Sequence, residues 1–134
     1  MLGANVPQGK QPHPGLWRIN LTGGDLRLLF GTDQTSSVDD PAYSPDGRTI
    51  AFTHIGVKAR QDHGFDQQFQ IWVIGSDGSS PRLAAPGRRP RWSKDGRYLA
   101  FDTQVVPGPP LAEASVDARS LRKIEGLTLS ACTT

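Results

Sequence analysis

Two aspartates occupy equivalent places in the sequence, and paired carboxylates can serve acid–base catalysis or metal binding. Asp46 lies in Ser-Pro-Asp-Gly-Arg and Asp95 in Ser-Lys-Asp-Gly-Arg. The Asp-Gly dipeptide is also typical of tight turns, where the carboxylate accepts backbone N–H hydrogen bonds. We favour this second interpretation and predict two structural turns. Ser44 and Ser93 open the two motifs, but no Gly-x-Ser-x-Gly elbow occurs, so we predict no nucleophile and no catalytic residue.

A second group of candidate residues lies in the segment 54–68, the main irregular stretch of the sequence. It contains His54, Asp62, His63 and Asp66. Imidazole and carboxylate groups are suitable metal ligands, but their spacing here matches no recognised ligand pattern, so we predict no metal site and no cofactor. We expect a solvated surface loop that contacts a partner, because inserted loops of repeat proteins often carry specificity. His54, Asp62 and His63 are its binding candidates.

A third group consists of Arg88, Arg89 and Arg91, which stand beside Trp92. Three cations next to an aromatic ring can grip an anionic ligand. Trp92 aligns with Tyr43 in the internal repeat described below, so its ring is more simply explained by packing. We expect the arginines in the link between two repeat units, where they form either a contact for an anionic ligand or acidic partner, or a solvated turn.

The elements that position these residues come from an internal repeat. PAYSPDGRTIAF (41–52) and PRWSKDGRYLAF (90–101) nearly coincide at an offset of 49 residues, within the range of repeat architectures. Each copy predicts an extended segment, a turn in which glycine accepts a positive φ, and a strand of alternating residues. A loop, a strand at 70–74, a turn at 76–79 and a strand at 81–84 complete the first copy.

One unit is therefore an antiparallel meander of four strands, a to d. Residues 16–29 match strands c and d, and residues 111–124 form a weaker third c-d pair, so the chain is c-d, a-b-c-d, a-b-c-d. No segment shows a sustained 3.6-residue period, so we expect almost no helix. We assign 1–15 to a disordered or extended segment, 16–124 to the repeat units and 125–134 to a tail or remnant strand.

The repeated apolar positions predict the core. Ile50 and Phe52 align with Leu99 and Phe101, and Trp17 aligns with Trp72. We expect these side chains to fill the seams between neighbouring sheets.

Composition restricts the function only weakly. Lys+Arg 15 against Asp+Glu 13 leaves a net charge of +2, which gives no strong reason to expect a nucleic-acid partner. Cys132 is the single cysteine and does not identify a compartment. The first fifteen residues show no signal peptide, and every apolar run is too short for a transmembrane helix.

SPDGRTIAF, followed by IWVIGSDGSSPRLA and WSKDGRYLAF, resembles the TolB-type β-propeller repeat, a relative of the WD repeats. The resemblance implies an all-β chain of four-stranded antiparallel blades around a central channel. The match runs from about residue 16 to 101, with a weaker extension to 124. A closed ring needs about four to eight blades, so we expect an incomplete ring: a fragment of a longer propeller, a ring completed by several chains, or an open stack.

Propellers of this type include TolB itself, scaffolds, some sugar lyases and the gating domains of prolyl-oligopeptidase-like serine peptidases. We predict a non-catalytic module, not an enzyme, that binds a protein partner through Arg88, Arg89, Arg91 and the segment 54–68. The alternative is a portion of a peptidase's gating propeller. We expect no nucleic acid, no membrane insertion and possible self-association that covers exposed blade faces; only the TolB resemblance implies a periplasmic location.

Overall fold

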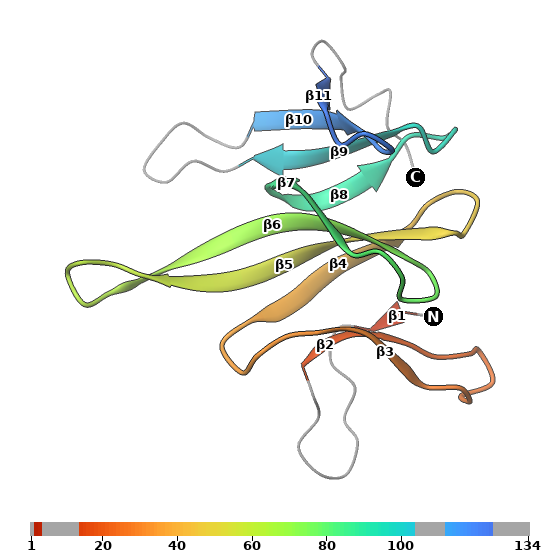
Figure 1. Cartoon of the computed structure of the whole chain (residues 1–134), viewed down its shortest axis with the longest axis horizontal. Helices are drawn as coiled ribbons and strands as arrows, with labels where there is room; N and C mark the ends of the chain where they lie inside the picture. The colour runs from red at the N-terminus through yellow and green to blue at the C-terminus, as the bar shows by residue number, and fades with distance from the viewer. Residues whose placement is uncertain (1, 4–13, 104–111, 125–134) are drawn as a thin grey trace.

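The chain is all-β throughout the part that the structure describes, a computed structural model of residues 2–3, 14–103 and 112–124 (Figure 1). These ranges contain no helix, and therefore none that is long and apolar enough to cross a bilayer. The predicted all-β class is confirmed. The strands are β1 (Leu2–Gly3), β2 (Gly15–Arg18), β3 (Arg27–Gly31), β4 (Ser37–Tyr43), β5 (Thr49–Ala59), β6 (Phe65–Gly75), β7 (Arg82–Pro86), β8 (Arg88–Trp92), β9 (Tyr98–Thr103), β10 (Ala112–Asp117) and β11 (Lys123–Ile124).

The strands form three antiparallel sheets that follow one another along the chain. Their strand orders are β1-β2-β3, β4-β5-β6-β7 and β11-β10-β9-β8. The second and third sheets are the predicted a-b-c-d units, and β2 and β3 are the predicted leading c-d pair. β1 lies within the segment 1–15 and pairs with β2 on the side opposite β3, where a complete sheet has its strand b. The described residues form no closed ring.

The first seam joins the first and second sheets. Ile50 and Phe52 of β5 are both 0% exposed and cluster with Leu16 of β2. The ring of Phe30, from β3, lies 5.0 Å from that of Phe52, centroid to centroid. Strand alternation places every second residue of β5 on this face, so the predicted seam positions Ile50 and Phe52 are buried between two sheets.

The second seam uses the opposite face of the second sheet. Ala51 of β5 and Val73 of β6 are buried there against Leu99 and Phe101 of β9. Leu99 and Phe101 therefore face the second sheet as Ile50 and Phe52 face the first. β5 serves both seams because its neighbouring side chains point to opposite faces of the sheet.

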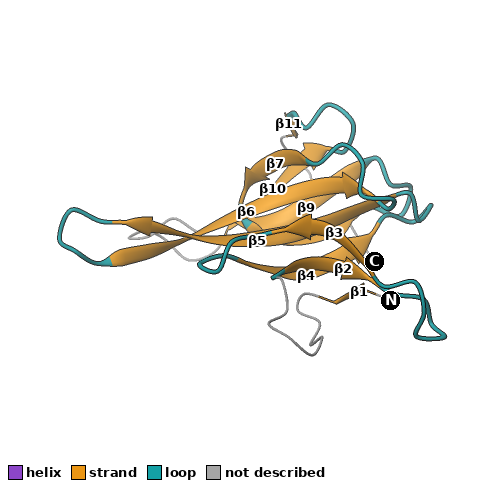
Figure 2. Ribbon diagram, turned by 60° about the horizontal axis from the view of Figure 1, so that its bottom comes forward, coloured by secondary structure: helices purple, strands orange, loops and turns teal. Residues whose placement is uncertain are grey.

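The segment 54–68 is not the loop that we predicted. β5 and β6 continue through it as paired strands, from Ile55 opposite Phe69 to Ala59 opposite Phe65, and the ribbon projects far beyond the sheets (Figures 1 and 2). The pairing of β4 with β5 ends at Ile55. Beyond that point neither face of the ribbon is covered by a sheet. The sequence of β5 still alternates here, with apolar residues at Ile55, Val57 and Ala59, and this was the signal that our loop prediction did not use.

Several sequence-based assignments lie outside the described residues. These include the tail or remnant strand at 125–134, Cys132, and most of the link between β9 and β10.

The seam assignment predicts the cost of truncating its aromatic residues. Phe52→Ala and Phe101→Ala each remove a side chain that is at most 2% exposed, so each should lower the free energy of unfolding by about 3–5 kcal/mol in a well-packed seam. Urea denaturation followed by tryptophan fluorescence measures this loss. The matched control is Phe65→Ala, because that ring is 69% exposed. An unchanged midpoint for either seam variant would contradict the assignment.

Candidate functional site

The two Asp-Gly-Arg turns have the same hydrogen-bond network. In the first turn, Ser44 Oγ donates to Asp46 Oδ1 at 2.6 Å, and the backbone N–H two residues after the aspartate donates to the same oxygen at 3.0 Å. In the second, Ser93 Oγ donates to Asp95 Oδ1 at 2.7 Å, and the corresponding N–H lies at 3.0 Å. Each serine hydroxyl also accepts the N–H of the residue five positions later. The prediction of structural turns is confirmed.

These contacts lower the pKa of both carboxyl groups. The Ser44 hydroxyl is the main cause for Asp46, and the Ser93 hydroxyl for Asp95, each followed by the backbone N–H of the turn arginine. Hydrogen bonds to the ionised form stabilise it, so both pKa values fall below the ordinary 3.8. Carboxylates that stay ionised at neutral pH and bind their own turn are poorly suited to act as general acids.

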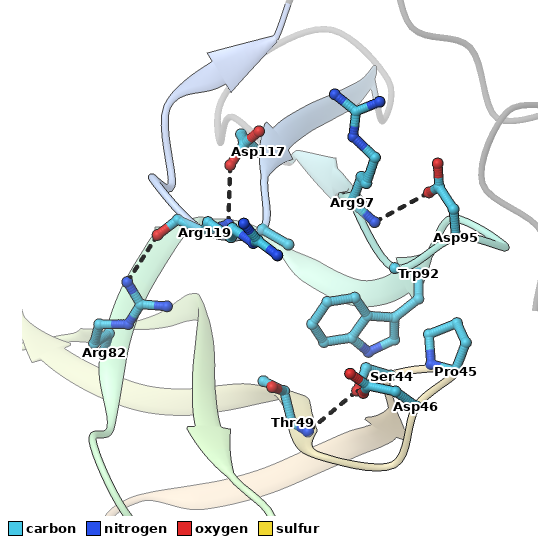
Figure 3. A pocket seen from close by; sticks show the side chains of 12 residues that line it. Ser44, Pro45, Asp46, Thr49, Arg82, Trp92, Asp95, Arg97, Asp117 and Arg119 are labelled. Carbon is cyan, nitrogen blue, oxygen red and sulfur yellow. Dashed lines mark hydrogen bonds between the residues drawn. The ribbon is translucent and has the colours of Figure 1, made fainter.

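A groove of about 870 Å³ separates the second and third sheets at the ends that carry these turns. Trp92 lies between the two turns (Figure 3), and its indole N–H donates to the backbone oxygen of Ala42 at 3.0 Å. On the far side, Arg82 donates to the backbone oxygen of Arg119 at 3.0 Å, which links β7 to the β10–β11 turn. The groove therefore has charges of both signs on its walls and a buried tryptophan that serves packing, as the repeat alignment indicated.

We predicted that the three arginines lie in a link between sheets. They lie instead within strand β8. Arg89 and Arg91 bind one carboxylate, that of Asp102 on β9, with shortest distances of 2.6 and 3.1 Å. Arg88 is separated from them and lies over the ring of Phe69, 5.1 Å from its centroid. The structure thus divides the group into an ion-paired couple and one arginine that faces the β5–β6 hairpin.

The candidates from segment 54–68 are also dispersed. His54 lies in the paired part of β5, where its ring meets Phe30 edge-on, whereas Asp62 and His63 lie at the hairpin tip. Arg60 donates to Asp62 and to Asp66, at 3.1 Å each. The two carboxylates at the tip therefore already accept hydrogen bonds from one guanidinium. Within the described ranges, no three histidine, cysteine, aspartate or glutamate side chains gather as metal ligands would.

Sequence analysis missed a second repeated contact, between strands a and b of each sheet. In the third sheet, Arg89 of β8 donates to Asp102 of β9. In the second sheet, Thr53 of β5 donates to Asp40 of β4 at 3.2 Å. Asp40 and Arg89 are 49 residues apart, as are Thr53 and Asp102, so the positions are equivalent while donor and acceptor are exchanged. Aligning the repeats beyond the shared letters shows that the positions are equivalent, whereas the contacts themselves depend on the cross-strand register.

Comparisons with solved structures identify the fold. The chain superposes on the β-propeller domain of the trilobed protease from Pyrococcus furiosus with a TM-score of 0.56 and 20% identity, over 92% of this chain and 41% of that one. It also superposes on an oligogalacturonate lyase, solved in complex with manganese, with a TM-score of 0.58 and 13% identity, over 81% of this chain and 28% of that one. The three sheets are thus successive blades of a partial β-propeller, as the sequence resemblance implied.

Sequence comparison finds a relative among enzymes. The chain is 37% identical over 79 residues to the uncharacterized peptidase YuxL of Bacillus subtilis (strain 168). The match covers 56% of this chain and 12% of that protein. No protein-family model matches the chain.

The prediction that this chain is a non-catalytic module and not an enzyme is contradicted by these relatives, since one is named a peptidase and the propeller neighbours come from a protease and a lyase. Our prediction rested on the absence of a nucleophile motif in this stretch of sequence. That absence does not exclude an enzyme, because a propeller domain and a catalytic centre can lie in different parts of one protein.

The turn geometry predicts how each aspartate titrates. Carboxyl-carbon NMR should place the pKa of Asp46 and of Asp95 below 3.8. Ser44→Ala should raise the pKa of Asp46 and leave that of Asp95 unchanged, while Ser93→Ala should do the reverse, so each turn is the control for the other. A titration of Asp46 that is unaffected by Ser44→Ala would refute the assignment.

The same shifts predict the sign of the pH dependence of stability. Because the folded pKa values are lowered, the stabilisation from these carboxylates is fully present above 3.8 and is lost as the pH falls through the lower, folded values. The urea midpoint of the wild-type chain should therefore drop in this acidic range, and Ser44→Ala combined with Ser93→Ala should make that drop smaller.

Proposed function

We propose that this chain is a portion of the gating propeller of a prolyl-oligopeptidase-like serine peptidase. The observation that carries the proposal is its 37% identity over 79 residues to the peptidase YuxL. The propeller neighbours support the fold alone, since a fold hosts many functions. In this role the blades form part of a rigid wall that controls which peptides reach the catalytic centre.

The chemistry of the chain is consistent with a wall rather than a catalytic centre. Ser44 and Ser93 are buried, and their hydroxyls are engaged in the turn networks. No Gly-x-Ser-x-Gly motif occurs in the sequence. We therefore expect the nucleophile, its base and its oxyanion hole in another part of the parent protein.

Two regions are our candidates for contact with a peptide or protein partner. One is the arginine strand β8 with Arg88, Arg89 and Arg91, which is an edge strand of the third sheet. The other is the β5–β6 hairpin with His54, Asp62 and His63.

In a complete propeller, further blades would cover the outer faces of the first and third sheets. Without such blades, self-association is the expected way to cover those faces.

The proposal predicts that the protein containing this chain reacts with a serine-hydrolase probe. An antibody raised against the chain should precipitate, from cells that express it, a polypeptide larger than 14.5 kDa that is labelled by a fluorophosphonate. Pretreatment with phenylmethylsulfonyl fluoride should abolish the label, because both reagents require an activated serine.

Labelling of other serine hydrolases in the same lysate is the control for probe activity. If that control succeeds while the precipitated polypeptide stays unlabelled, the peptidase proposal is wrong.

A further inference from the structure

A second groove lies at the base of the β5–β6 hairpin, away from the Asp-Gly-Arg turns. It has a volume of about 510 Å³. One wall is the beginning of β6, with Phe65 and Phe69, and the other is the connection from β7 to β8, with Pro86 and Arg88; Lys58 of β5 also lines it.

The β6 wall of the groove is an unpaired strand edge. β7 ends at Pro86, opposite Gln70, and the last contact on this side is the Gly87 N–H donating to the Phe69 backbone oxygen at 2.9 Å. From Phe65 to Gln68, β6 has no strand partner on this side among the described residues. An exposed edge of this kind is a template for a further strand.

The register shows which backbone groups are free. At the hairpin tip, the Arg60 N–H donates to the Gly64 oxygen, so 60 and 64 form a hydrogen-bonded pair, and such pairs alternate along an antiparallel ladder. Phe65, Gln67 and Phe69 therefore direct their N–H and C=O groups away from β5. The Phe69 oxygen does meet Gly87, as this alternation requires, which leaves the groups of Phe65 and Gln67 facing the groove.

The groove contains cationic side chains that form no ion pair with the described residues. The Arg88 guanidinium lies over the Phe69 ring, and its Nε is buried without a hydrogen-bond partner. Lys58 forms no ion pair with the described residues. The acidic residue of the groove, Asp66, is bound by Arg60 at 3.1 Å. Lys58 is paired with Asp66 and so lies on the opposite face of the ribbon from Phe65 and Phe69. An incoming carboxylate on the Phe69 face would therefore meet Arg88, a cation that lacks a carboxylate partner.

We propose that this groove binds an extended peptide segment that carries a carboxylate. The peptide adds a strand to β6 beyond the end of β7, exchanging main-chain hydrogen bonds with Phe65 and Gln67. Its carboxylate accepts hydrogen bonds from Arg88, and an apolar side chain on the same face covers the exposed ring of Phe65. This site does not depend on the proposed peptidase function, because it uses only groups of this chain.

Fluorescence anisotropy with the whole chain tests the site. The probe is fluorescein-labelled Gly-Thr-Val-Thr-Val-Glu with a free carboxyl terminus. A C-terminal amide and a Glu-to-Gln peptide distinguish the terminal from the side-chain carboxylate; one of the two replacements should weaken binding about tenfold, the loss of one charge-assisted hydrogen bond. N-methylation of alternate amides should abolish binding, because it removes the donors of the added strand.

Variants of the chain test the two recognition elements separately. Arg88→Met should weaken binding about tenfold, whereas Lys94→Met, which changes an exposed cation outside the groove, should not. Gln67→Pro should abolish binding because it removes the outward N–H, while Gln67→Ala keeps that group and should bind. Each variant is first checked by its amide NMR spectrum for the wild-type fold.

Four results would overturn the proposal. The first is the absence of binding by the wild-type chain, and the second is equal binding of the N-methylated peptide. The third is unchanged affinity in Arg88→Met. The fourth is slow hydrogen exchange of the Gln67 amide before peptide is added, which would mean that another segment of the chain or a second copy already occupies the edge.

Discussion

The fold depends on one constraint: the central sheet must bury both of its faces. Along β5, Ile50 and Phe52 point to the first sheet, while Ala51, between them, points to the third. Large residues on one face and a small one on the other let β9 bring Leu99 and Phe101 close to the central sheet without overlap. The second and third sheets thus each supply large side chains from their strand b to the seam before them. A chain built this way extends by adding sheets and has no single centre.

Hydrogen bonds fix the geometry that this packing requires. The Ser-x-Asp-Gly turn joins strands a and b in both complete sheets with nearly identical distances, and Gly47 and Gly96 take φ values of 72° and 73° that suit glycine. Further along the same strands, Thr53 with Asp40 and Asp102 with Arg89 hold equivalent positions with exchanged polarity. Since geometry is kept while charge changes, individual blades can differ in what they present to a ligand.

The features that could be predicted from the sequence are those set by local chemistry or by repetition. The Asp-Gly turns, the strand order of each sheet and the seam positions Phe52 and Phe101 all follow from turn propensity, alternation and the repeat. The extension of β5 and β6 through 54–68 was not predicted, although Ile55, Val57 and Ala59 alternate with polar or small residues, because the mostly polar run from 60 to 68 is typical of a loop. The pairing of Arg89 and Arg91 with Asp102 depends on cross-strand register. The relation to a peptidase was reached only as the alternative implied by the repeat, because no nucleophile motif lies in this stretch of sequence.

The most direct test of the sheet stack is a set of nuclear Overhauser contacts in the isotope-labelled chain. We expect the Phe52 ring to show contacts to Phe30, across the first seam, and the Phe101 ring to show contacts to Val73 and Ala51, across the second. The two aromatic rings should share no contact with each other, since the central sheet separates their seams. Contacts from both phenylalanines to one common set of residues, or none across either seam, would contradict the account.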